Sequence, residues 1–529
     1  MVIRPDACGA RHMAGHLQKG KTMSMGKKGS LTRRLAAIVG ALAVGAMGLA
    51  GATLSANADD AITGVGNINP DTKTSLTINK FDGKQGGAGD GTKQNTTGFG
   101  NALAGVTFKI QQVVSKDGKS INLDTPEGWD LIDGVQASDV TSAPYALQDV
   151  ASLTDSSVTT DAKGTVTADL PHGLYYVTET GHGNNNIVSE TAPFLVTLPL
   201  PQTKGNWLYD VNVYPKNQVL SAPVKTINKT EDQTGVKVGG TVEYTIKQTV
   251  PRLNEGETYN QAVIYDILKA DELAYNDTTS VSLNGMPLVK DTDYTVAANG
   301  SSWTLTSDRL ATLKADDVIT VVFTAKVLKV TESGAIENGP GSGKPGEPGY
   351  GSTFNGTTTP GTTTPHTYWG QLQVIKQDES KNPLKDAQFA VTATAADGSC
   401  PADIAGTHIA DGTSDFNGTV QWNANPTSPL GLFVANSSDG PLQNPSKDYC
   451  LYETKAPAGF IVGTFDHKVT IKPGTTTGVN TVTVTNVQQN HPNLPLTGAA
   501  GTIVMTLGGL ALVVAGGAAY TIARKRSAR

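Results

Sequence analysis

The sequence predicts an all-β protein built from several domains. Strand-like alternation of polar and apolar residues recurs along the chain, for example at 240–246, 318–325, 468–471 and 481–485. Gly, Asn, Asp and Pro separate these short segments, and helical periodicity is almost absent between them. A length of 529 residues corresponds to about three domains of ordinary size. We therefore expect tandem β-sandwiches.

Composition and charge exclude several classes of protein. The chain has 41 Lys and Arg against 47 Asp and Glu, a net charge of −6, which does not suit a basic nucleic-acid binder. Its 3 Cys are too few for a disulfide scaffold or a multi-cysteine zinc array, and its 8 His show no paired-ligand spacing. We expect no metal, no cofactor and no nucleic-acid partner.

The N-terminus has the layout of a secretory signal peptide. Two Lys and two Arg within 27–34 precede an uncharged stretch at 35–54, which ends in the small residues 56–58, Ala-Asn-Ala. This is the order of a basic n-region, an apolar h-region and an A-x-A cleavage site. Residues 1–58 are therefore predicted to be a leader, with Asp59 as the first mature residue.

The C-terminus carries a second apolar segment. Residues 499–523 contain no charge and are followed by a basic tail at 524–529, so the segment is long enough to span a bilayer and the tail is expected to be cytoplasmic. Directly before it stands Leu494-Pro495-Leu496-Thr497-Gly498. The three parts in this order resemble the cell-wall sorting signal of Gram-positive surface proteins, which a sortase cleaves after Thr497. The alternative is a plain membrane anchor.

Composition changes divide the mature chain into three predicted domains. The first covers 59–219 and the second 220–355. A Thr/Pro/Gly tract at 356–366 is predicted to be an extended linker, and the third domain covers 367–489.

The first and third segments resemble each other in sequence. Four elements match in the same order, which indicates two copies of one sandwich with a differently patterned domain between them. The matching pairs begin at Leu76 and Leu372 (LxxxKxD), Asn101 and Asn382 (NxL), Asp161 and Asp415 (DxxGTV), and Tyr175 and Tyr449 (YxxxET).

Three polar residues of the third segment are expected to share one core. Lys376 lies on an alternating strand, Glu453 follows an apolar run, and Asn486 ends the final strand. Buried polar groups are costly unless they satisfy each other. Together they resemble the Lys/Glu/Asn triad of CnaB domains, which form an intramolecular isopeptide bond. The resemblance implies a Lys376–Asn486 link promoted by Glu453; the alternative is three ordinary edge residues.

The middle segment offers a related set. Lys225 and Asp266 resemble the corresponding pair of CnaA domains, in which an Asp takes the role of the promoting acid. The amide partner is predicted to be Asn338, with Asn355 as the second choice, because the Gly/Pro-rich insert at 339–351 obscures the final strand.

The first segment contains a comparable set of a lysine, an acid and an amide. Lys80 and Glu179 occupy the triad positions and Asn217 is the best-placed amide. The fold class implied by these resemblances is three tandem Ig-like sandwiches, CnaB-like, CnaA-like and CnaB-like in order.

Two cysteines remain after removal of the leader. Cys400 and Cys450 lie in the third segment, and on an exported protein an isolated pair is expected to form a disulfide. The alternative, a catalytic thiol, would need a histidine partner, for which His467 is the nearest candidate.

The most specific motif ends the first segment. The alternation of Val211 and Val213 predicts a strand that ends at Tyr214, because Pro215 prevents further pairing and leaves Lys216 exposed. The motif resembles WxxxVxVYPKN, the pilin motif of sortase-assembled shaft pilins, and implies an amide between Lys216 and Thr497 of a neighbouring subunit. Its defined positions are Trp207, Val211, Val213, Tyr214, Pro215, Lys216 and Asn217.

These resemblances imply a structural role. The chain resembles the major shaft subunit of an actinobacterial sortase-assembled fimbria: exported, transiently membrane-anchored, then attached to the wall. The implied partners are identical subunits, a pilus-specific class C sortase, a housekeeping sortase, peptidoglycan and a tip pilin; no receptor can be named. The alternatives are a monomeric wall-anchored adhesin, which would not need Lys216, and a basal or tip pilin. No enzymatic activity is expected beyond autocatalytic crosslinking.

Overall fold

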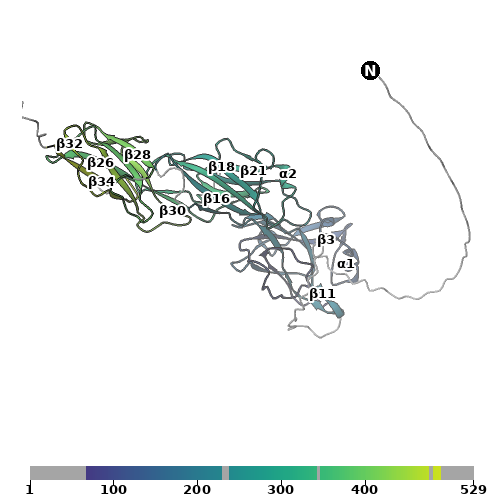
Figure 1. The fold of residues 1–529 in the computed structure, drawn as a ribbon. Coiled ribbons are helices and arrows are strands. Elements are labelled where there is room, and N and C mark those ends of the chain that lie inside the picture. The colour runs from purple at the N-terminus through teal and green to yellow at the C-terminus, as the bar shows by residue number, and fades with distance from the viewer. Residues whose placement is uncertain (1–66, 229–236, 342–345, 405, 476–479, 490–529) are drawn as a thin grey trace, which may run out of the picture. The chain divides into compact units, whose positions relative to one another are not determined.

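Strands form nearly all of the regular structure in the described part of the chain (Figure 1). The computed structural model describes residues 67–489 apart from 229–236, 342–345, 405 and 476–479. The predicted leader, LPLTG pentapeptide, apolar segment and basic tail lie outside the described residues. Within the described ranges, no helix combines the length and apolar character needed to cross a membrane.

The N-terminal region, residues 67–219, is built around strand β1. The alternation of β1 buries Leu76 and Ile78 and exposes their neighbours to the other side. Strand β1 lies between β13, which runs parallel to it, and the antiparallel β7. A second sheet has the order β10-β8-β3-β4. The strands are β1 (Thr74–Asn79), β2 (Phe81–Asp82), β3 (Thr107–Lys116), β4 (Lys119–Ser120), β5 (Tyr145–Asp149), β6 (Ser157–Thr159), β7 (Thr165–Leu170), β8 (Gly173–Gly181), β9 (Ile187–Ser189), β10 (Phe194–Leu198), β11 (Leu200–Pro201), β12 (Trp207–Leu208), β13 (Asp210–Val213) and β14 (Lys216–Val219).

An insertion between β4 and β5 packs against residues of β3, β8 and β10 in a second, smaller core. It contains helix α1 (Pro126–Leu131), which begins with a Pro in its first turn after the capping side chain of Thr125. A short 3₁₀ helix, η1 (Asp139–Thr141), follows within the insertion; η2 (Thr154–Ser156) comes after β5, and η3 (Thr203–Gly205) precedes β12. The ring of Trp129 in α1 lies 5.2 Å from the ring of Trp207. Trp207, the first residue of the WxxxVxVYPKN sequence, is therefore packed against this insertion.

The middle region, residues 220–360, contains two five-stranded sheets and one further strand, β23 (Ala335–Glu337), which pairs with β26 (His366–Asp378). Their orders are β15-β16-β22-β18-β19 and β20-β21-β17-β24-β25. Both contribute to one buried cluster, in which Trp303 of one sheet contacts Phe323 of the other at 5.1 Å. The elements are β15 (Val224–Ile227), β16 (Thr241–Thr249), β17 (Ala262–Ile267), β18 (Leu273–Leu283), β19 (Met286–Pro287), β20 (Tyr294–Val296), β21 (Ser302–Leu305), α2 (Ser307–Leu310), β22 (Val318–Val327), β23 (Ala335–Glu337), β24 (Gly349–Phe354) and β25 (Thr357–Pro360).

The tract predicted to be a linker contains a strand. Residues Thr357–Pro360 form β25, which pairs antiparallel with β24. Asn355 and Gly356, both with positive φ, make the tight turn between the two strands. Successive Thr residues favour extended, half-buried pairing, so this part of 356–366 extends the middle region beyond its predicted end.

The C-terminal region, residues 361–489, also has two sheets. One has the order β23-β26-β34-β32, with β30 also pairing with β26, and the other β29-β28-β27-β31-β33. Strands β26 and β34 run parallel, with Asp378 opposite Asn486. The strands are β26 (His366–Asp378), β27 (Gln388–Ala393), β28 (His408–Ser414), β29 (Val420–Trp422), β30 (Leu430–Ser437), β31 (Lys447–Lys455), β32 (Phe460–Ile461), β33 (Lys468–Ile471) and β34 (Thr481–Gln488). All four strand segments predicted from alternation are confirmed, as β16, β22, β33 and β34.

The sequence repeat corresponds to repeated contacts. In each copy the backbone N–H of the motif Lys donates to the carbonyl of the repeated Gly at 2.7 Å, and the motif Asp accepts from the backbone and side-chain amides of the repeated Asn. The Lys, Gly, Asp and Asn are Lys80, Gly164, Asp82 and Asn101 in the first copy and Lys376, Gly418, Asp378 and Asn382 in the last.

Candidate functional site

Lys80, Glu179 and Asn217 meet in the core of the N-terminal region. Lys80 lies between β1 and β2, Glu179 on β8 and Asn217 on β14. The Lys80 Nζ donates to Glu179 Oε2 at 2.9 Å and to Asn217 Oδ1 at 2.5 Å. The side chains of Lys80 and Glu179 are fully buried, and so is Asn217. The three residues proposed from the sequence therefore form one contact network.

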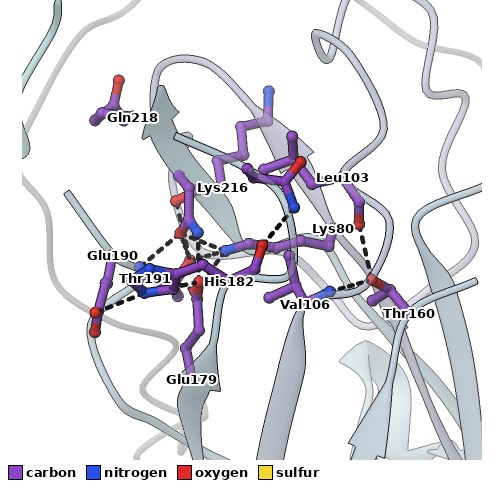
Figure 2. A network of polar contacts seen from close by, with 12 residues as sticks. Lys80, Leu103, Val106, Thr160, Glu179, His182, Glu190, Thr191, Lys216 and Gln218 are labelled. Carbon is purple, nitrogen blue, oxygen red and sulfur yellow. Dashed lines mark hydrogen bonds and ion pairs between the residues drawn. The ribbon is translucent and has the colours of Figure 1, made fainter. Parts of the chain in front are cut away.

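Thr191 belongs to the same network, although it was not among the residues predicted from the sequence. It lies in the loop between β9 and β10, and Figure 2 shows it converging with Lys80 and Glu179. Its backbone N–H donates to Asn217 Oδ1 at 2.7 Å, and its hydroxyl oxygen is 3.0 Å from the same atom. The hydroxyl also accepts from Lys80 Nζ, and its single proton can be donated either to Asn217 Oδ1 or to the Lys216 carbonyl oxygen at 2.9 Å.

Burial changes the acid–base chemistry of the first and middle lysines. Loss of hydration lowers the pKa of Lys80 to about 8, against the opposing attraction of Glu179. The same cause lowers the pKa of Lys225 to about 8, opposed by Asp266. Both amines therefore become neutral, and nucleophilic, far more readily than a surface lysine.

The middle site is built from strands of both sheets. Lys225 on β15 donates from Nζ to Asp266 Oδ2 on β17 at 2.7 Å, and Nζ lies 4.1 Å from the ring centre of Tyr350. The Asn338 amide, just after β23, donates to the same Oδ2 at 3.3 Å. Burial raises the pKa of Asp266, with Lys225 opposing. The site therefore contains an amine, an acid and an amide within contact distance.

The structure distinguishes the two amides considered for the middle site. Asn338 reaches Asp266, whereas Asn355 lies in the β24–β25 turn. There its Oδ1 accepts from the backbone N–H groups of Asn260 and Gln261, at 2.9 and 3.3 Å. Asn355 is thus a turn residue, and Asn338 is the amide in contact with the acid.

The C-terminal site repeats the arrangement with a longer Lys–acid distance. Lys376 Nζ is 4.0 Å from Glu453 Oε1 and donates to the Val484 carbonyl at 3.0 Å. The Asn486 amide donates to Glu453 Oε1 at 2.7 Å, and the backbone N–H of Gly463 donates to Asn486 Oδ1 at 3.0 Å. Burial lowers the pKa of Lys376 and raises that of Glu453.

The disulfide predicted in this region is confirmed. Cys400 and Cys450 are bonded, with Cα atoms 5.6 Å apart. Cys450 is on β31, the strand that also carries Glu453, so the bridge fixes the strand of the acid. Both sulfurs are bonded, which rules out the catalytic-thiol alternative in this state. His467 instead contacts the Leu451 carbonyl through Nδ1 at 3.0 Å.

The sequence predicted that Lys216 is exposed, and the structure contradicts this. Strand β13 does end at Val213, but pairing resumes after Pro215, where β14 joins β2 with Lys216 opposite Phe81. The side chain is half-buried, and its Nζ lies over the ring of Phe99 at 4.5 Å. Burial lowers the pKa of Lys216, while the charge of Asp82 opposes the change.

A groove of about 460 Å³ runs beside Lys216. Its walls come from the Gly-rich loop 85–90, from Gln94 and Phe99, and from the motif residues 212–216. Phe99 is held by edge-on contacts with Phe81 and Tyr214, at 5.8 and 5.5 Å. The amine of Lys216 is therefore placed in a partly enclosed, partly apolar setting.

The remaining predicted site residues lie at the C-terminus. Leu494, Pro495, Thr497 and Gly498 are outside the described residues. Across the ranges that the structure describes, no group of three or more His, Cys, Asp and Glu side chains is arranged to hold a metal ion.

Three family models match this chain. The Gram-positive pilin subunit D1 N-terminal domain matches residues 71–218, and a prealbumin-like fold domain matches 370–488. The LPXTG cell wall anchor motif matches 486–528. The fold and these matches define a cell-wall-anchored surface protein.

Two similar proteins and one solved structure identify the family to which this surface protein belongs. The chain is 32% identical to fimbrial subunit type 2 of Actinomyces naeslundii, and the match covers 94% of this chain and 97% of that one. It is 28% identical to fimbrial subunit type 1 of Actinomyces viscosus, and that match covers 91% of this chain and 97% of the relative. It resembles the full-length major pilin SpaD of Corynebacterium diphtheriae with a TM-score of 0.57 and 25% identity, over 81% of this chain and 100% of that one. The chain belongs to the Gram-positive pilins, the family of fimbrial subunits, which are structural proteins and not enzymes.

Proposed function

We propose that this chain is the major shaft subunit of its fimbria, joined by an amide between the Thr497 carbonyl of one subunit and the Lys216 Nζ of the next. The observation that carries the proposal is the setting of Lys216, a half-buried amine over Phe99 in a groove formed by the pilin motif. A surface lysine that only contributes solubility has no need of such a setting.

The proposed reaction has two stages. A sortase thiolate attacks the Thr497 carbonyl, the chain from Gly498 leaves as an amine, and a thioester to Thr497 remains. The Lys216 amine then attacks this thioester, releasing the thiolate and forming the amide. Burial favours the neutral, reactive amine, and the apolar wall provided by Phe99 reduces competition from water.

The alternative is a monomeric adhesin anchored to the wall, and a denaturing gel separates the two. Wall extracts boiled in detergent should contain a regular ladder of bands that react with an antibody to this chain. The adhesin predicts one wall-linked monomer band and no ladder, and that result would contradict the shaft assignment.

We further propose three intramolecular isopeptide links in CnaB-like, CnaA-like and CnaB-like sandwiches. The sandwiches would follow the sequence boundaries 59–219, 220–355 and 367–489, the middle one extended by β25. Contacts between amine, acid and amide at each site support the links. The pairs are Lys80–Asn217, Lys225–Asn338 and Lys376–Asn486, with Glu179, Asp266 and Glu453 as the respective acids.

The links explain how such a shaft would carry load. Tension would enter each subunit at Lys216 and leave at Thr497. A Lys225–Asn338 link would carry it past strands β16 to β23, and a Lys376–Asn486 link past strands β27 to β33. Chain enclosed by a link bears no tension, so between the middle and last links the load would pass only through residues 339–375, which contain β24, β25 and most of β26. The proposed partners are identical subunits, a class C sortase, a housekeeping sortase, peptidoglycan and a tip pilin.

Link formation is expected to depend on pH. A chain refolded from denaturant should lose about 17 Da for each link, as one ammonia leaves. Because the pKa values of Lys80 and Lys225 are lowered to about 8, their neutral fraction rises with pH up to that value. The rate of mass loss at these two sites should therefore rise about tenfold per unit below pH 8 and then level off. Time-resolved peptide mass spectrometry checks this, and a flat profile from pH 6 to 8 would contradict it.

A further inference from the structure

The N-terminal and C-terminal sites share a feature that the acid–amine–amide scheme does not use. At each site one backbone N–H points at the side-chain oxygen of the Asn. The Thr191 N–H donates to Asn217 Oδ1 at 2.7 Å, and the Gly463 N–H donates to Asn486 Oδ1 at 3.0 Å.

The two donors occupy equivalent places in the fold. Thr191 lies in the loop between β9 and β10, and Gly463 in the loop between β32 and β33. In each region the strand before the loop pairs with the strand of the Asn, and the strand after it pairs with the strand of the acid. The loop therefore spans the gap between acid and amide. The two loops differ in sequence, Glu-Thr-Ala-Pro at 190–193 and Val-Gly-Thr-Phe-Asp-His at 462–467, yet both place a backbone N–H at the same point.

These donors determine which way each Asn amide points. A backbone N–H can only donate, so the atom that faces it must be the amide oxygen. The amide nitrogen then faces the carboxylate, and it donates to Glu179 Oε1 in the first site and to Glu453 Oε1 in the last, the latter at 2.7 Å. The acid thus contacts the nitrogen that leaves as ammonia, and the carbonyl oxygen is polarised by the main chain.

We propose that Thr191 and Gly463 are catalytic residues of the first and last links, their backbone N–H groups forming the oxyanion site of the reaction. The inference rests on the proposed isopeptide links and adds a role that the acid cannot fill while it faces the amide nitrogen. Donors aimed at the atom where negative charge develops give large rate effects in buried sites.

The step balances with these groups alone. The neutral Lys80 amine attacks Cγ of Asn217, a C–N bond forms and negative charge develops on Oδ1, where the Thr191 N–H holds it. Glu179 takes a proton from the attacking nitrogen and passes it to Nδ2. The C–Nδ2 bond then breaks, ammonia leaves and the carbonyl re-forms, so one amine and one amide give a new amide and ammonia.

Each donor has a local adaptation to this role. The Thr191 hydroxyl lies 3.0 Å from Asn217 Oδ1, so it can donate a second hydrogen bond as charge builds there. Gly463 has no side chain at a point where a Cβ would lie 2.1 Å from the Thr485 carbonyl oxygen. Glycine is required there, because only glycine lets the N–H approach Asn486 so closely.

The test compares the two links within one chain. In the first variant, an ester oxygen replaces the backbone N–H of Thr191 in the mature chain. The rate of formation of the Lys80–Asn217 link should fall by about 100-fold or more, while the Lys376–Asn486 link should form at its usual rate. The same exchange at Gly463 should produce the reverse pattern. Thr191→Val removes only the hydroxyl, so it should lower the rate of formation of the Lys80–Asn217 link by about tenfold and leave the other link unaffected. Thr191→Ser keeps a hydroxyl and should restore the rate. Peptide mass spectrometry during refolding measures each link separately.

The outcomes separate the inference from the proposal on which it rests. Tryptophan fluorescence before link formation verifies that each variant has folded. If the ester at 191 and the ester at 463 each leave both links at wild-type rates, the oxyanion assignment is wrong although the links exist. If the unaltered chain shows no loss of about 17 Da at any site, the isopeptide proposal itself fails.

Discussion

Replacement of Lys216 by Ala is expected to collapse the detergent-resistant ladder to a single monomer band. The proposed polymer has one acceptor amine per subunit, and that amine would be lost. Lys216→Arg should have the same effect, because a guanidinium retains the charge but remains protonated and cannot resolve the thioester. Wall extracts from cells that express each variant in place of the native chain provide the measurement.

A matched control separates this effect from a general loss of lysine. Lys119 is exposed on β4 of the same region, and Lys119→Ala should leave the ladder unchanged. The monomers of both Lys216 variants should still reach the wall, since their sorting motif is intact. A normal ladder from Lys216→Ala would show that another amine accepts Thr497.

Glu453→Ala is expected to abolish the Lys376–Asn486 link and to destabilise the C-terminal region strongly. Lys376 would remain buried without its acid, and the amide would lose the group that carries the proton. A covalent tie across roughly 100 residues contributes about 4 to 5 kcal/mol in the chain-entropy description. Its loss should lower the unfolding midpoint of this region by on the order of 20 °C.

Calorimetry and intact mass together test this prediction. The measured mass of the variant should be about 17 Da above the mass calculated for the same sequence with all three links, because one ammonia is retained. Glu453→Gln, which keeps the shape but cannot take up the proton, should also lack the link. Glu379→Ala alters an exposed carboxylate just after β26 and should retain both mass loss and midpoint. Normal link formation in Glu453→Gln would remove Glu453 from the reaction.

Much of the fold was predictable because strand alternation and repetition are visible in the sequence. The LxxxKxD motif predicted a common arrangement around Lys80 and Lys376, and the two lysines make the same backbone contacts. The linker prediction was wrong at Thr357–Pro360, because a Thr-rich tract between turns can serve equally well as a spacer or as a strand. Pairing with β24 decides between the two, and the sequence does not encode that pairing locally.

The setting of Lys216 was harder to predict for a related reason. The Gly-rich stretch 83–98 has no periodicity, so nothing in it indicates that Phe99 will return to cover the lysine.

Thr191 and Gly463 could not be predicted from the sequence for a different reason. The main contribution of each is a backbone N–H, which every residue except proline has, so a Thr or a Gly at one position of a loop does not by itself indicate the role. Only the placement of the loop between acid and amide strands distinguishes them.

The most direct test of the central claim is the chemical identity of the junction between subunits. Fimbriae purified from the wall and digested with trypsin should yield a branched peptide in which Thr497 is joined by an amide to the Nζ of Lys216. Its mass and fragment ions would locate both ends, and trypsin should fail to cut at Lys216 in every subunit that has accepted a partner. Fimbriae whose Lys216 is cleaved and unmodified throughout, or whose Thr497 is joined to a different lysine, would contradict the account.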